Sequence, residues 1–270
     1  MPAPTDATTT RPTAVVTGAS GGIGFEFAKL LARDGHDLLL VARDRARLDE
    51  AAEEIRNASA VSVHVLPTDL ATPSAPDAVF AALRDAGLAI DVLVNNAGFA
   101  SYGPFAETDL AHELSLIRVN VEALTHLTKL ALPGMIERRS GKILNVASTA
   151  AFLPGPLMAV YYASKAYVLS FSEALAEELR GSGVTVTALC PGPTATGFQR
   201  RAGMEASKIV SGRRLPGAAD VAAAGYRGLT RGDRIVIPGL NNRLTILAPR
   251  ALPRALLTRL VRRAQERTAH

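Results

Sequence analysis

The segment Thr13-Ala-Val-Val-Thr-Gly-Ala-Ser-Gly-Gly-Ile-Gly24 joins a short apolar run to a glycine-rich turn. Residues 13–17 have the continuous apolar character of a buried strand, and a helical pattern follows the turn. Glycines at 18, 22 and 24 permit a tight turn, close approach of the backbone to a pyrophosphate, and packing of the helix start against the sheet. Because the helix amino terminus then faces the anion, the segment predicts a dinucleotide-binding unit.

Further short apolar runs alternate with helical patterns along the rest of the chain. Such runs are typical of strands in a parallel sheet that is covered on both faces. With right-handed crossovers, they predict a single-domain α/β fold, a Rossmann-type doubly wound parallel sheet of about seven strands, with its site at the strand carboxyl ends. Besides 13–17, the expected strands are 38–41, 61–66, 91–95, 142–148, 184–189 and 235–237.

A second motif, Tyr161-Tyr-Ala-Ser-Lys165, has Ser148 thirteen residues upstream of its first tyrosine. Four residues are about one helical turn, so Tyr161 and Lys165 project from one helix face. A nearby ammonium favours phenolate and lowers the tyrosine pKa from about 10, and a serine hydroxyl can hold a substrate oxygen. The trio predicts proton transfer beside a carbonyl; the alternative is an ordinary half-buried helix face.

Taken together, these motifs resemble the short-chain dehydrogenase/reductase family, in its subgroup of single-domain enzymes. The resemblance extends from about Pro12 to Pro238. The other residues that carry it, in the order and spacing of the family, are Asp69, Asn95, Asn96, Ala97, Gly98, Asn120, Pro191 and Gly192.

The resemblance implies a role for each residue of the catalytic set. Tyr161 would be the general acid in reduction and the base in oxidation, and Ser148 would orient the carbonyl oxygen. Lys165 would lower the pKa of Tyr161 and hold the nicotinamide ribose. Asn120 would anchor a water that links Lys165 to solvent, and Tyr162 would be packing or pocket wall.

The resemblance also implies a cofactor site that supplies the hydride chemistry. Asp69 would lie near the adenine, Asn96 and Gly98 along the cofactor, and 191–194 beside the carboxamide. The expected cofactor-binding residues are Gly18, Ser20, Gly22, Ile23, Gly24, Arg43, Asp69, Asn96, Gly98, Lys165, Pro191 and Thr194.

The end of the second expected strand bears on cofactor choice. A carboxylate there would bind a ribose 2′-hydroxyl, whereas this chain has Ala42 and then Arg43. A guanidinium can grip a phosphate with two hydrogen bonds, which favours NADP(H) over NAD(H). The alternative is that Arg43 is a solvated residue at the start of a helix over 44–57. Gly21 stands where many NADP-using relatives place a second basic residue, so discrimination between the cofactors is expected to be incomplete.

The sequence says less about the substrate than about the cofactor. The long connection 194–216 is expected to be a lid or a disordered flap over the substrate. Several apolar side chains would lie near the pocket by family position, which favours a hydrophobic ketone, aldehyde or alcohol; a core role is the equal alternative. These side chains are Phe99, Tyr102, Phe105, Phe152, Leu153 and Leu157.

We therefore expect an NADP(H)-dependent oxidoreductase that interconverts a ketone or aldehyde and an alcohol. The resemblance further implies a homodimer or homotetramer. The alternative from another functional class is a non-catalytic regulator that senses NADP(H) on the same fold.

Charge is distributed unevenly along the chain. Residues 200–270 carry 15 Lys and Arg against 4 Asp and Glu, whereas residues 1–199 carry 15 against 21. The stretch 241–270 resembles a basic amphipathic helix broken by Pro249 and Pro253. It could pack on its own domain, lie on an anionic membrane, or contact another subunit. Nucleic-acid binding is not expected, because no aromatic or recognition-helix pattern accompanies the basic residues.

The remaining features favour a cytoplasmic enzyme. Residues 1–12 read as a disordered tail rather than a signal peptide, and the catalytic domain is expected over 13–240. No apolar stretch reaches the roughly 18 residues of a membrane span. Cys190 is the only cysteine, so no internal disulfide is possible, and the five histidines lack metal-ligand spacing, so no metal site is expected.

Overall fold

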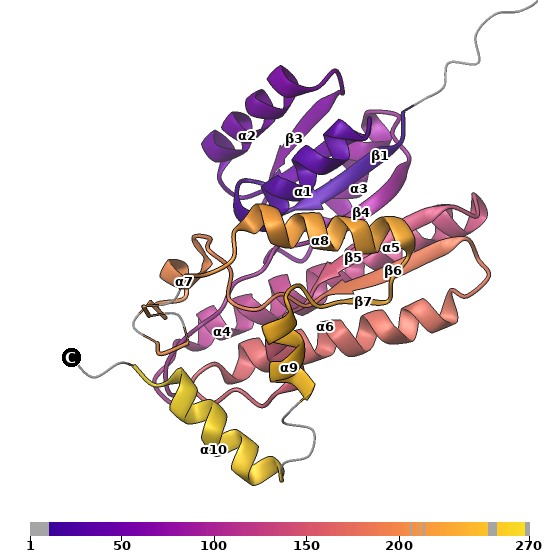
Figure 1. Ribbon diagram of the computed structural model, residues 1–270. Coiled ribbons are helices and arrows are strands. Elements are labelled where there is room, and N and C mark those ends of the chain that lie inside the picture. Colours follow the sequence, from indigo (N-terminus) through magenta and orange to yellow (C-terminus); the bar gives the residue numbers. More distant parts are fainter. Residues whose placement is uncertain (1–10, 206, 210, 213, 248–252, 268–270) are drawn as a thin grey trace, which may run out of the picture.

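The computed structural model describes residues 11–205, 207–209, 211–212, 214–247 and 253–267 (Figure 1). Most of the expected amino-terminal tail, Pro249, and parts of the lid and the C-terminal stretch lie outside the described residues.

A seven-stranded sheet forms the centre of the molecule, and every strand pair in it is parallel. The strand order is β3-β2-β1-β4-β5-β6-β7, so the direction of winding reverses between β1 and β4. Ligands of such sheets bind at the carboxyl ends of the strands beside this reversal. The strands are β1 Thr13–Thr17, β2 Asp37–Ala42, β3 Val63–Pro67, β4 Ile90–Asn95, β5 Gly141–Val146, β6 Val184–Leu189 and β7 Ile235–Val236.

Helices cover both faces of the sheet, which confirms the doubly wound α/β fold expected from the sequence. Helices α1 (Gly22–Arg33), α2 (Arg45–Ala58) and α8 (Ala218–Arg231) enclose one apolar core against the sheet. Helices α3 (Ala75–Asp85), α5 (Leu124–Glu137) and α6 (Ala159–Glu178) enclose the other core on the opposite face. The nearly continuous apolar strands are explained by this double covering.

The expected strands lie within one or two residues of their predicted bounds. One strand end and one helix start differ from the prediction for a local reason. The fifth strand ends at Val146 rather than at Ser148, because Ser148 caps the short helix η2 (Thr149–Phe152) by accepting the Ala150 N–H. Helix α2 begins at Arg45 because Asp44 is its N-cap and accepts the Arg47 N–H.

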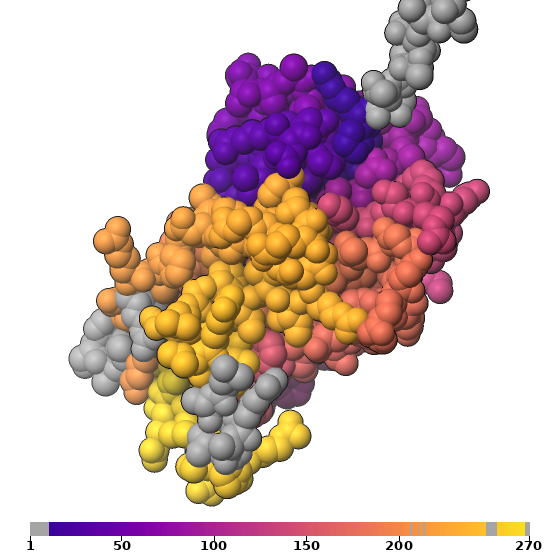
Figure 2. All heavy atoms as spheres, turned by 45° about the vertical axis from the view of Figure 1, so that its right-hand side comes forward, coloured from indigo at the N-terminus to yellow at the C-terminus, as the bar shows by residue number. Residues whose placement is uncertain are grey.

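The lid and the C-terminal stretch both contain helices. The lid holds the short helix α7 (Phe198–Arg201), and the C-terminal stretch holds α9 (Leu240–Leu247) and α10 (Arg254–Gln265). Pro253 precedes α10, as the expected helix break requires. The buried face of α10 packs on residues of α6 and of the lid, so this part of the stretch belongs to the same folded unit (Figures 1 and 2). Within the described residues, no helix is both long and apolar enough to span a bilayer.

Candidate active site

The turn between β1 and α1 has the geometry expected of a phosphate-binding turn. Gly18 has a φ of 66°, in the left-handed region that favours glycine. A Cβ on Gly24 would lie 2.5 Å from the Gly18 carbonyl oxygen, so the helix start packs on the turn only without a side chain. No side chain of the described residues caps the amino terminus of α1, so its backbone N–H groups are available to an anion. These features fit the pyrophosphate of a dinucleotide.

The first residues after β4 brace this turn. The Asn96 side-chain amide donates to the carbonyl oxygens of Thr17, at 2.8 Å, and Gly18, at 3.2 Å. The Thr17 hydroxyl in turn accepts the backbone N–H groups of Asn96 and Ala97, each at 3.0 Å. Asn96, expected along the cofactor, thus holds the turn in shape through its side chain.

The structure brings the expected catalytic residues together at the carboxyl end of β5. Tyr161 and Lys165 lie on the first turns of α6, and Ser148 follows β5. The Ser148 side chain lies close enough to the Tyr161 phenol to lower its pKa. The Lys165 ammonium donates to the Val146 carbonyl oxygen at 2.7 Å and lies 5.8 Å from the centroid of the Tyr161 ring.

Burial dominates the proton affinities of this site. Desolvation raises the pKa of Tyr161 above its usual value, and the nearby Ser148 side chain partly offsets this effect. Desolvation also lowers the pKa of Lys165 to about 8. The effect of Lys165 on the Tyr161 pKa, which we expected from the sequence, stays a prediction. The net direction is upward because the phenol is withdrawn from water.

Asn120 lies in a π-helical turn, η1 (Arg118–Ala123), between α4 (Leu110–Ile117) and α5. Such turns often occur at functional sites because they redirect a side chain. Here the Asn120 amide exchanges hydrogen bonds with the backbone of Phe99, at 3.1 and 3.0 Å, and donates to Ser164 at 3.1 Å. A Cβ on Gly98 would lie 3.1 Å from the Asn120 Oδ1 and 3.5 Å from the Lys165 Nζ. Gly98 therefore lets both polar groups approach the chain that follows β4.

The connection after β6 reaches back over the phosphate-binding turn. The Pro191 carbonyl oxygen accepts the Thr149 N–H at 2.9 Å, next to Ser148. Thr194 is buried, and its hydroxyl donates to the Gly192 carbonyl oxygen at 2.9 Å. A Cβ on Gly22 would lie 3.3 Å from the Thr196 side chain, so the start of the lid lies over this turn.

Arginines from two separate segments lie near the end of β2. Arg43 is exposed, and its guanidinium lies 4.0 Å from the carboxylate of Asp69. Arg201 of α7 is partly buried, which lowers its pKa, and the charges of Arg47, Arg43 and Arg200 lower it further. Sequence reasoning identified Arg43 and missed Arg47 and Arg201, because only the fold brings Arg201 within reach of the charges of Arg43 and Arg47.

Five of the six residues expected near a substrate pocket lie in different surroundings. Tyr102 and Leu153 pack with Tyr161 in one apolar cluster, as a pocket wall would. Phe99 and Phe152 pack in two other apolar clusters, and Phe105 is 63% exposed. The core alternative therefore holds for Phe99 and Phe152, and Phe105 lines neither the cluster nor the cavity described next.

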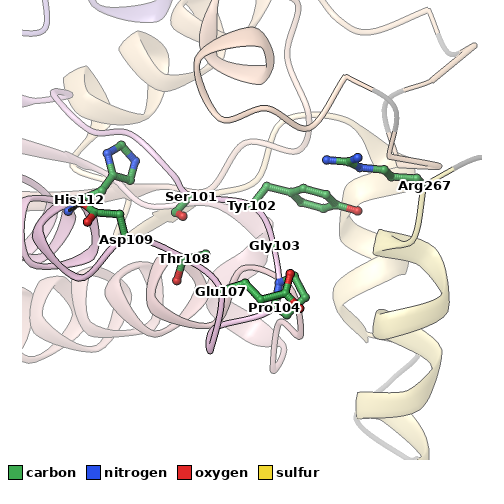
Figure 3. Close-up of a pocket in the computed structure, with 9 residues that line it drawn as sticks. All are labelled: Ser101, Tyr102, Gly103, Pro104, Glu107, Thr108, Asp109, His112 and Arg267. Atoms are coloured by element: carbon green, nitrogen blue, oxygen red, sulfur yellow. Dashed lines mark hydrogen bonds between the residues drawn. The ribbon is translucent and has the colours of Figure 1, made fainter.

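An open cavity of about 520 Å³ is lined in part by Tyr102 (Figure 3). Tyr102 points from its loop toward Arg267, which follows α10 (Figure 3). Sequence reasoning gave no role to Arg267, because the basic, amphipathic pattern of its stretch gives no signal for a contact with Tyr102. The lining residues are Ser101, Tyr102, Gly103, Pro104, Glu107, Thr108, Asp109, His112 and Arg267.

Comparisons with known proteins agree with this geometry. A family model described as short chain dehydrogenase matches residues 12–206. Human very-long-chain 3-oxoacyl-CoA reductase is 38% identical over 68% of this chain and 59% of its own length, so the chain spans about three fifths of this relative.

Two solved structures share the fold over nearly the whole chain. A short-chain dehydrogenase from Sphingobium yanoikuyae, in complex with NADPH, has a TM-score of 0.80 and 37% identity, covering 91% of this chain and 94% of its own. The bulky-bulky ketone specific alcohol dehydrogenase from Comamonas testosteroni has a TM-score of 0.76 and 29% identity, covering 91% and 100%. The chain therefore belongs to the short-chain dehydrogenase family of oxidoreductases.

Proposed function

We propose that this protein reduces hydrophobic ketones or aldehydes to alcohols with NADPH, with Tyr161 as the general acid. The proposal is supported mainly by four side chains that lie close together, near the amino terminus of α1, whose N–H groups no side chain of the described residues caps. They are Ser148, Tyr161, Lys165 and Asn120. Ser148 lies close enough to the Tyr161 phenol to lower its pKa, and Lys165 and Asn120 lie next to Gly98. This combination suits proton delivery to a carbonyl oxygen held at the carboxyl end of the sheet.

Each side chain has a distinct task in the proposed reaction. NADPH, when bound on the turn before α1, supplies the hydride. The Ser148 hydroxyl holds the carbonyl oxygen beside the Tyr161 phenol, and Tyr161 gives its proton to that oxygen. The Lys165 ammonium stabilises the phenolate that remains. Asn120 fixes the backbone at Phe99 and so keeps this wall of the site in place.

The protonation states of this pair suit ketone reduction. The Tyr161 phenol, whose pKa burial raises, carries a proton at neutral pH that it can give to a carbonyl oxygen. The pKa of Lys165, at about 8, leaves most of this side chain charged at neutral pH. A charged lysine beside a neutral tyrosine is the state that ketone reduction requires.

The preference for NADP(H) over NAD(H) rests on the arginines near the end of β2. Arg43, Arg47 and Arg201 are close enough for their charges to repel one another. A 2′-phosphate placed among them would relieve this repulsion and could accept bidentate hydrogen bonds. The exposed Asp69, at 4.0 Å from Arg43, would oppose the phosphate and limit the preference.

The side chains around Tyr161 favour a hydrophobic substrate. Phe198 lies with its ring centroid 5.5 Å from that of Tyr161, and Met204, Leu153 and Tyr102 belong to the same apolar cluster. The names of the similar proteins, a very-long-chain 3-oxoacyl-CoA reductase and a bulky-ketone alcohol dehydrogenase, point in the same direction. A small polyol would find few hydrogen-bond partners on such a surface.

The test combines cofactor titration with turnover. The purified protein is titrated with NADPH and NADH while nicotinamide fluorescence is followed, and a panel of hydrophobic ketones is then added while absorbance at the NADPH band is recorded. We expect tighter binding of NADPH and its oxidation by at least one ketone. Binding without turnover on a broad panel would favour a non-catalytic sensor, and no binding of either cofactor would refute the proposal.

Self-association is part of the proposal. Helix α4 exposes three aliphatic side chains, Leu110, Leu114 and Ile117, to which a second copy could bind. Light scattering coupled to size exclusion would give the mass in solution. A homodimer or homotetramer is expected, and a monomer at micromolar concentration would contradict this part.

Membrane contact is a second, separate candidate for the C-terminal stretch. Helices α9 and α10 expose Leu240, Leu244, Leu256 and Leu260 in a segment rich in arginine. Sedimentation with vesicles containing phosphatidylserine tests this contact, and a cytoplasmic enzyme without it would stay in the supernatant.

A further inference from the structure

The connection after β6 contains a glycine, Gly192, that is explained by a contact with a distant helix. The φ of Gly192 lies outside the left-handed region, so its backbone conformation does not require glycine. A Cβ on this residue would lie 2.9 Å from both the Cγ and the Nδ2 of Asn242, and closer still to its Oδ1. Gly192 therefore leaves the space in which the side-chain amide of Asn242, from α9, lies against the backbone.

Asn242 is also anchored from its own side. Its Nδ2 donates to the Pro238 carbonyl oxygen at 2.6 Å, two residues after β7. Ile246, one helical turn further along α9, is 3% exposed, so Asn242 and Ile246 mark the inner face of this helix. The helix packs against η2, which begins directly after Ser148. The amide of Asn242 is thus a fixed contact rather than a solvated side chain.

The residue before Gly192 holds the hydroxyl of Ser148. The Pro191 carbonyl oxygen accepts the Thr149 N–H at 2.9 Å and the Ser148 hydroxyl at 3.4 Å. The Ser148 hydroxyl also accepts the Ala150 N–H at 3.1 Å. Because 3.4 Å is long for a hydrogen bond donated by a hydroxyl, the proton of Ser148 can leave Pro191 for another carbonyl oxygen at little cost. A closer Pro191 oxygen would retain this proton, and a more distant one would leave the hydroxyl free to rotate.

The lid holds Gly192 from another direction. The Thr194 hydroxyl donates to the Gly192 carbonyl oxygen at 2.9 Å, and the buried Gln199 amide donates to the Thr194 carbonyl oxygen at 2.7 Å. Gly192 therefore has one contact from the lid and one from α9. The lid contact lies within residues 12–206, the part that the family model matches, whereas Asn242 lies beyond it.

We propose that Asn242 is a positioning residue that, through Gly192, sets the distance between the Pro191 carbonyl oxygen and the Ser148 hydroxyl. The inference rests on the proposed ketone reduction, in which Ser148 holds the substrate carbonyl oxygen. In this role Asn242 needs no contact with substrate or cofactor. It keeps Pro191 where the Ser148 hydroxyl is oriented by a hydrogen bond and is still released to the substrate.

The first test is a double-mutant cycle in the full chain. The assay is NADPH-dependent reduction of 2-decanone or acetophenone, whichever reacts faster. Asn242→Ala should lower kcat about tenfold, while KM and the Kd of NADPH change less than about twofold, because the substrate oxygen loses its oriented partner in the transition state. In the Ser148→Ala background, which lacks the hydroxyl, Asn242→Ala should lower kcat by less than about a further twofold.

The matched control is Asn241→Ala. Asn241 precedes Asn242 in α9, and its side chain is exposed. The control should leave kcat, KM and the Kd of NADPH within about twofold of wild type. A merely structural role would give a different pattern. If Asn242→Ala lowered kcat by the same factor with and without the Ser148 hydroxyl, or if Asn241→Ala produced the same loss, the inference would be overturned.

Amide hydrogen exchange separates this inference from the proposed function, because it needs neither ketone nor turnover. Exchange of the Thr149 N–H, which the Pro191 oxygen accepts, is followed by NMR in the wild type and in both single variants of α9. We expect exchange at Thr149 to become about tenfold faster in Asn242→Ala alone, with the amides of β1 unchanged.

Unchanged exchange at Thr149, or equal acceleration in β1, would overturn the positioning role even in an active enzyme. Faster exchange confined to Thr149 and its neighbours, in a protein that reduces no ketone, would refute the proposed function and support the action of Asn242 on Pro191.

Discussion

The glycine-rich turn offers a matched pair of substitutions, Gly24→Ala and Gly21→Ala. A Cβ on Gly24 would lie 2.5 Å from the Gly18 carbonyl oxygen and 2.4 Å from the Asn96 amide nitrogen. An ordinary carbon contact needs about 3.5 Å, so turn or helix must move by about 1 Å. Gly21 has no neighbour within 4 Å of a built Cβ, and its φ of 161° is extended backbone that alanine adopts.

The expected magnitudes follow from these distances. Forcing one methyl group into packed backbone costs about 1–3 kcal/mol, and the displaced turn no longer directs its N–H groups at the pyrophosphate. We expect Gly24→Ala to raise the Kd of NADPH by about 10- to 100-fold and to lower the midpoint of thermal unfolding. Gly21→Ala should stay within about 0.5 kcal/mol of wild type in both respects.

The assay is NADPH titration by fluorescence, with thermal unfolding followed by circular dichroism on the same samples. Wild-type affinity in Gly24→Ala, or an equal loss in Gly21→Ala, would show that the cofactor does not lie on this turn and would refute the reasoning.

Four further predictions concern the chemistry. Tyr161→Phe should lower turnover by about 10² to 10⁴-fold while the Kd of NADPH stays within about twofold, and substantial residual activity would contradict the acid role. Arg43→Ala and Arg201→Ala should each weaken NADPH by about tenfold and leave NADH unchanged, because only NADPH carries the 2′-phosphate; equal losses for both cofactors in a titration would argue against the phosphate site. Gly21→Arg should widen the preference for NADPH, since a side chain there meets open space, and an unchanged ratio of the two Kd values would count against this. Because the pKa of Lys165 is lowered to about 8, kcat/KM for reduction should fall as pH rises through that value and the ammonium loses its proton, whereas a flat profile to pH 9.5 would exclude Lys165 as the titrating group.

Local patterns were sufficient for most of the fold. The strand over Thr13–Thr17 and the strand over Val184–Leu189 have the predicted bounds, because a continuous apolar run between turn residues has few other structures open to it. The carboxyl end of β5 was placed too late, because Ser148 extends an apolar run in sequence yet caps the next helical turn in the structure.

The candidate site was predictable where its residues share one element or follow directly from a strand end. Tyr161 and Lys165 lie one helical turn apart, so their relation is fixed by the helix alone. The direction of the Tyr161 pKa was not predictable from this spacing. It depends chiefly on how much water the tertiary packing removes from the phenol.

By itself, the sequence determined the doubly wound sheet and the glycine-rich turn before α1, because each depends on contacts within a few residues or on strand order. It also indicated the residues that we propose for the proton relay. Only the tertiary structure decided which side chains from distant segments lie around the candidate site. Gln265, whose amide donates to the Tyr162 hydroxyl, lies 103 residues from that tyrosine, and no periodicity relates the two. The charge of Arg43 likewise acts on Arg201 only because the lid folds back over the turn between β1 and α1. Such contacts between distant segments arise from packing of apolar faces, which is non-directional and leaves no local signature in the chain.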